Sequence, residues 1–164
     1  MAKKRIEAAD SETMSFIKRV VRDRRPELLN VSISAILIYG ANGKPAMPGK
    51  DGKVLAKIQK TSAADARRGM PWLKLSLDGD HWSGCTGRQQ EAIVFHELCH
   101  VVYDGDDDDG QPILSLRGHD WHVTGFEDVA KQFGDDSPEK LIAADFAERY
   151  GQLLMWPEAA TAAA

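Results

Sequence analysis

Two histidines and a glutamate stand in a spacing that suits metal chemistry. The segment His96-Glu97-Leu98-Cys99-His100 places its two histidines four residues apart. On an α-helix of about 3.6 residues per turn, that spacing puts both imidazoles on one face, where they can share one ion. Glu97 then lies beside the ion rather than on it, where it can take a proton from a water that the ion activates. The pattern predicts metal-assisted hydrolysis.

The flanking sequence favours a helix through this motif. Thr86 and Gln89 have the spacing of a capping box, in which two side chains satisfy free backbone N–H groups at a helix start. No proline or glycine occurs from 88 to 102, and apolar residues recur there at helical intervals, namely Ala92, Phe95, Cys99 and Val102. We therefore expect a helix over 88–102. The five-residue motif also occurs by chance, so the presence of a third ligand decides whether it marks a metal site.

A catalytic zinc site usually has three protein ligands and one open position, so one ligand must come from elsewhere in the chain. The candidates after the motif are His119, Asp120 and His122, with Asp104 and Glu127 as less favoured alternatives. We favour His119, because imidazole is the commonest zinc donor among these groups and two of the five histidines fall in this short segment. The alternative is that His119 caps the following helix and His122 is a surface residue.

Length and composition indicate one compact domain. The chain has 164 residues, of which 43% are hydrophobic, enough for one core and too few for two ordinary domains. We expect flexible ends at 1–10 and 157–164 around a single domain at 11–156. Two cysteines are too few for a disulfide framework, and no apolar run or leader directs the chain to a membrane or out of the cell. We therefore expect a cytoplasmic protein.

The net charge of −4 gives no overall attraction to nucleic acid or to an anionic membrane. The charge is nonetheless uneven, because basic residues crowd the first 25 positions, among them Arg22, Arg24 and Arg25. Such asymmetry is usually a solvated helix face, and a weak nucleic-acid contact is the alternative. The acidic run at 104–110 lacks the register of a calcium loop, since its twelfth place holds Ser115 instead of a glutamate. We interpret it as a solvated turn.

The order of patterns predicts an α+β fold. A basic amphipathic helix at 11–25 ends before Pro26, and three strands follow at 30–39, 53–60 and 72–78. After the motif helix, residues 111–117 form a short extended segment that returns the chain toward the motif. Helices are then expected at 123–133 and 138–155. A substrate is expected to lie extended along an edge strand, which we place at 72–78.

The same residues resemble a known family. His-Glu-Leu-Cys-His, an acidic turn, Leu116-Arg-Gly-His-Asp120 and a helix with Phe126 and Val129 that ends in Gln-Phe-Gly134 are similar to the putative phage metallopeptidase domain family. The resemblance covers about 26–135. It implies a minimal zincin-like fold, distantly similar to SprT-like proteases. It also implies Zn²⁺ on His96, His100 and His119, with Glu97 as the catalytic base.

The implied reaction is hydrolysis of a peptide bond in a protein or peptide substrate. Glu97 would take the proton from the attacking water and pass it to the leaving amine. The developing oxyanion needs a donor besides the metal, and the candidates are Tyr103, seven residues after His96 and expected on the same helix face as both histidines, and His122. The segment Trp121-His122-Val-Thr-Gly125 departs from the acidic, helix-forming sequence expected there, which leaves the role of His122 open.

Three functions are compatible with the sequence. The first is a zinc peptidase encoded by a phage or prophage and acting in the bacterial cytoplasm. The second is a zinc-stabilised interaction module without turnover, which replacement of Glu97 by glutamine would leave unaffected. The third is a SprT-like protease directed to DNA-bound proteins by its basic first helix, which predicts salt-sensitive DNA binding. Zinc is favoured over manganese or cobalt by ligand type alone.

Overall fold

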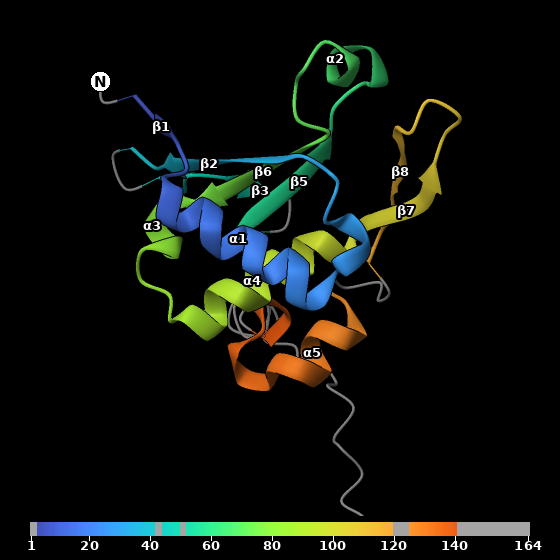
Figure 1. The fold of residues 1–164 in the computed structure, drawn as a ribbon. Helices are drawn as coiled ribbons and strands as arrows, with labels where there is room; N and C mark the ends of the chain where they lie inside the picture. Colours follow the sequence, from blue (N-terminus) through green and yellow to red (C-terminus); the bar gives the residue numbers. More distant parts are fainter. Residues whose placement is uncertain (1–2, 42–43, 50–51, 120–124, 141–164) are drawn as a thin grey trace, which may run out of the picture.

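A four-stranded sheet forms the centre of the protein in a computed structural model, which describes residues 3–41, 44–49, 52–119 and 125–140 (Figure 1). The strand order is β1 (Arg5–Ala8), β2 (Ile33–Tyr39), β6 (Leu73–Asp78) and β5 (Ala56–Lys60). The two inner strands β2 and β6 run parallel, and each outer strand is antiparallel to its neighbour. The α+β class predicted from the sequence is therefore confirmed.

Two long helices cover one face of this sheet, α1 (Ser11–Arg24) and α4 (Gly87–Cys99) (Figure 1). β6 alternates as its sequence predicts: Leu73, Leu75 and Leu77 are buried, whereas Lys74 and Ser76 are partly exposed. These leucines share a core with Ile17 and Val20 of α1 and with the apolar residues of α4. Burial of this apolar surface is the main force that holds α4 on the sheet.

The first helix forms where it was predicted. The Asp10 side chain accepts a hydrogen bond from the N–H of Thr13 at 2.7 Å and so caps the start of α1. Pro26 begins a 3-10 turn, η1 (Pro26–Leu28), because its ring cannot continue the preceding helix.

The motif helix starts as predicted and ends earlier than predicted. Both bonds of the capping box at Thr86 and Gln89 are present. The expected extension to Val102 is wrong, because α4 ends at Cys99 and the next residues form β7 (Val101–Asp106). The backbone carbonyls at the C-terminal end of α4 accept hydrogen bonds from two guanidinium groups. Arg25 donates to the carbonyl oxygens of Leu98 and Val101, and Arg117 donates to that of Cys99. The side chains that close the helix come from distant parts of the chain.

β7 pairs with β8 (Pro112–Leu116) in an antiparallel hairpin whose tip carries the acidic run. The extended return segment predicted at 111–117 is thus confirmed. The helix predicted at 123–133 appears as α5 (Glu127–Phe133), which is followed by Gly134 with a positive φ of 53° and by η2 (Gly134–Asp136). The smaller elements are β3 (Pro48–Gly49), β4 (Gly52–Lys53), α2 (Ala63–Arg67) and α3 (Gly79–Trp82).

Two expectations about the sheet are corrected. The sheet has a fourth strand, because residues 5–8, expected to lack regular structure, pair with β2 as β1. The strand at 72–78 is not an edge, since β6 is hydrogen-bonded to β2 on one side and to β5 on the other. The edge nearest α4 is β5.

Of the helix predicted at 138–155 only residues 138–140 are described, and they are helical; the tail at 157–164 lies outside the described residues. No helix in the described part of the chain is both long and apolar enough to span a membrane.

Candidate metal centre

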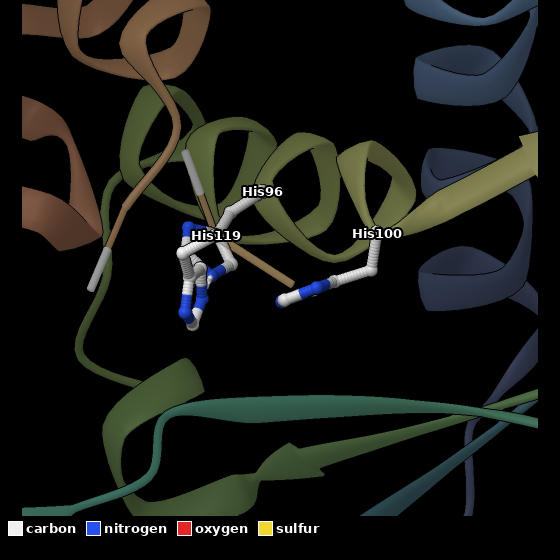
Figure 2. A group of neighbouring side chains, drawn as sticks. All are labelled: His96, His100 and His119. Carbon is white, nitrogen blue, oxygen red and sulfur yellow. Dashed lines mark hydrogen bonds between the residues drawn. The ribbon is translucent and has the colours of Figure 1, made fainter. Parts of the chain in front are cut away.

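His96 and His100 project from the same face of α4, as their spacing predicts (Figure 2). Their ring centroids are 5.4 Å apart. His96 is buried and His100, at the end of the helix, is half-buried. The pair is thus set at the boundary between the core and solvent.

The β7–β8 hairpin brings His119 to this pair. The backbone N–H of Arg117 donates to the carbonyl oxygen of His100 at 2.8 Å, and Nδ1 of His100 lies 2.8 Å from the carbonyl oxygen of Arg117. These reciprocal bonds fix the chain two residues before His119 against the end of α4. The ring centroid of His119 then lies 4.6 Å from that of His100 and 5.1 Å from that of His96. The three side chains extend into the same space (Figure 2).

The geometry of the three imidazoles fits one bound ion. One ligand nitrogen from each histidine lies within 4.8 Å of the others. The Nε2 atoms of His96 and His119 are 3.1 Å apart. A tetrahedral zinc with Zn–N bonds of about 2.0–2.1 Å holds its nitrogens about 3.3 Å from one another. His119 is exposed, so the site has a solvent-facing side where a fourth ligand can enter.

The outer nitrogens of both helix histidines have acceptors. Nδ1 of His96 lies 2.6 Å from Oε1 of Glu139, and Nδ1 of His100 faces the Arg117 carbonyl. A backbone carbonyl can only accept, so Nδ1 of His100 carries a proton, and an ionised Glu139 accepts from Nδ1 of His96 in the same way. This tautomer leaves the Nε2 lone pair of each ring for the shared site.

Phe126, a residue without polar atoms in its side chain, packs against all three rings. It is fully buried, and its ring centroid lies 5.0, 4.7 and 5.2 Å from those of His96, His100 and His119. The Arg117 guanidinium lies over the same ring, 4.8 Å from its centroid. Phe126 therefore closes the apolar side of the site. The sequence marked it only as part of a helix pattern.

Glu97 is buried beside the histidines and is held by the sheet. Its Oε2 accepts a hydrogen bond from the backbone N–H of Ile58 in β5 at 2.7 Å. Burial raises the pKa of the Glu97 carboxyl above its ordinary value, and this effect is opposed by His96, His100 and the Ile58 N–H. A carboxylate that is held in place and whose proton affinity is raised is suited to accept a proton.

The other predicted site residues lie elsewhere or are not described. Tyr103 is on β7 instead of the helix face that was expected, and its hydroxyl donates to Asp106 at 3.0 Å, a bond that raises the pKa of Tyr103. Its role as an oxyanion donor stays a prediction. Glu127 pairs with Lys131 on α5, and Asp104 is exposed on β7; neither belongs to the histidine group. Asp120 and His122 lie outside the described residues.

The basic residues of α1 make contacts within the protein. Arg24 pairs with Glu91 of α4 at 2.8 Å and donates to Gln132. Arg25 pairs with Glu27 besides binding the end of α4, and Arg22 pairs with Asp23. DNA binding through these arginines stays a prediction, and two of them have a structural role.

Comparison with known proteins agrees with the site. The sequence profile described as putative phage metallopeptidase matches residues 4–151. No curated protein and no solved structure matches the chain. The match includes the motif helix, the hairpin, His119 and the segment that carries Phe126 and Glu139. Since it covers most of the sequence, the chain belongs to the putative phage metallopeptidase family.

Proposed function

We propose that the protein is a zinc-dependent peptidase, encoded by a phage or prophage and acting in the bacterial cytoplasm. The observation that carries the proposal is the convergence of His96, His100 and His119 next to the buried carboxylate of Glu97. Membership of the family implies a metal and a peptide substrate. Three imidazoles with an open fourth side form a donor set that zinc favours.

The protein's own groups have distinct tasks in this proposal. When bound, the ion would polarise the substrate carbonyl and make water a stronger nucleophile at neutral pH. The Nε2 atoms of the three histidines would hold it. The bond from Ile58 fixes Oε2 of Glu97, and we assign Oε1 to accept the water proton and return it to the leaving amine.

The substrate is proposed to pair with β5. The N–H of Ile58 points away from β6, since it donates to Glu97. Alternate residues of a strand present their main-chain groups to the same side, so Ala56 and Lys60 share this outward orientation. An extended peptide added along this edge would run past Glu97.

Metal analysis of the purified protein tests the proposal. We expect about one zinc per chain in the wild type, loss of metal in His119→Ala, and cleavage of a generic protein substrate by the wild type alone. His81→Ala is the matched control, because His81 is on α3 and outside the histidine group, and it should retain the metal. Equal metal content in wild type and His119→Ala would refute the three-histidine site. Metal binding without cleavage would favour the interaction module.

A further inference from the structure

Among the described residues, Glu139 is the most deeply buried charged side chain next to the histidines. Its exposed fraction is 2%. Oε1 lies 2.6 Å from Nδ1 of His96 and accepts a second bond from the backbone N–H of Phe126 at 3.2 Å. Oε2 is also buried and has no hydrogen-bond partner among the described residues. This carboxylate thus touches one proposed ligand and the backbone of the phenylalanine that packs on all three.

We infer that Glu139 is a positioning residue for the metal centre: it orients His96 through Nδ1 and supplies the negative charge that balances a bound dication. The inference rests on the proposed function. The metal would lie on the far side of the His96 ring from Glu139, at Nε2. The ring thus connects the two charges, and the hydrogen bond to a carboxylate makes Nε2 a stronger donor.

The charge at Glu139 has little compensation from the contacts described. Burying a carboxylate is costly unless it is paired and hydrogen-bonded. Here one oxygen has two donors, and neither of them carries a formal charge when His96 is neutral. The nearby dication would offset this cost. The carboxylate should therefore stabilise the metal-bound protein more than the metal-free protein.

The two helix histidines are held differently, which makes the inference testable by side-chain substitution. His100 donates to a backbone carbonyl, which no side-chain change removes. His96 donates to a side chain whose charge can be removed with little change of shape. Glu139→Gln keeps an oxygen that can accept from His96 and Phe126, removes the negative charge, and places an amide NH₂ group where Oε2 lies.

The experiment measures zinc affinity by competition with a chromophoric chelator, together with the visible spectrum of the cobalt-substituted protein. We expect Glu139→Gln to bind zinc about 10–100-fold more weakly than wild type and Glu139→Ala at least as weakly. The matched control is Glu127→Gln, the same change at an exposed position on α5, which should bind like wild type. The cobalt spectrum should change in Glu139→Gln and stay unchanged in the control.

Thermal unfolding without metal separates positioning from a merely structural role. We expect metal-free Glu139→Gln to unfold no lower than the metal-free wild type, and zinc to raise its unfolding temperature less. If Glu139→Gln lowered the unfolding temperature equally with and without zinc, and left zinc affinity unchanged, the inference would be overturned and the proposed function would stand. A wild type that binds no zinc would instead refute the proposed function itself.

Discussion

The backbone N–H of Ile58 donates to Oε2 of Glu97 at 2.7 Å, and this bond joins the edge strand of the sheet to the motif helix. Ile58 is itself buried in the core. Edge-strand N–H groups normally face solvent or another strand. Here one of them fixes the proposed base, so the strand that would receive a substrate also positions the group that would act on it.

Replacing Glu97 by glutamine separates an enzyme from a binding module. The amide oxygen can still accept from Ile58, but the side chain can no longer take a proton at neutral pH. We expect cleavage to fall by about 10²–10⁴-fold, the usual contribution of a general base. Zinc content should be unchanged, because the proposed ligands are the three histidines and Glu97 is not one of them.

Steady-state cleavage and metal analysis on the same preparations measure both effects. The metal-free variant should unfold at no lower temperature than the metal-free wild type, since a buried charge is removed. Wild-type rates in the glutamine variant would contradict the role of Glu97.

The sequence predicted the local half of the candidate site. His96, Glu97 and His100 follow from helical spacing, and His119 follows from the clustering of histidines. Phe126 and Glu139 carry no such signal, since they lie 26 to 43 residues from the two helix histidines that they contact, and this proximity depends on the path by which the chain returns to the helix. The end of α4 was misplaced for the same reason: Val101 and Val102 continue the apolar pattern, but they pair with β8, and Arg25 and Arg117 bind the carbonyls at the helix end.

Phe126 should support metal binding, whereas a nearby phenylalanine should not. Phe126→Leu and Phe133→Leu both shrink a buried ring in the same segment, and we expect each to lower the free energy of unfolding by about 1–3 kcal/mol. Phe133 packs against Phe95 and the arginines of α1 and α4, away from the histidine group. Only Phe126→Leu should weaken zinc binding.

Denaturant unfolding and chelator competition give the two quantities. Equal zinc affinity in the two leucine variants would indicate that Phe126 contributes to the core alone.

Arg25 should stabilise the fold, and Arg22 should not. The Arg25 side chain is only 18% exposed and donates to two carbonyls at the end of α4, whereas Arg22 is exposed and pairs with its neighbour Asp23. We expect Arg25→Ala to lower the free energy of unfolding by about 2–3 kcal/mol and Arg22→Ala to change it by less than about 0.5 kcal/mol. Arg25→Lys should recover only part of the loss, because lysine lacks the planar fork.

Urea titration of the three variants measures these differences. The same difference between the two arginines matters for a test of DNA binding. Weaker DNA binding by Arg22→Ala would indicate a direct contact of the exposed side chain, whereas weaker DNA binding by Arg25→Ala could also result from a destabilised fold. Equal stability of Arg25→Ala and wild type would show that the contacts at the end of α4 are dispensable.

Cys99 should be inert in the folded protein. It is buried, and burial raises the pKa of its thiol to about 11, so only about 0.1 per cent is thiolate at pH 8. In a Cys85→Ser variant, where Cys99 is the remaining cysteine, we expect almost no reaction with a thiol reagent at pH 8 until denaturant is added, and then one equivalent. The converse variant, Cys99→Ser, should react faster while folded, because Cys85 is only partly buried. Rapid labelling of Cys99 without denaturant would mean that the end of α4 opens readily. A site built on His100 would then lack a fixed support.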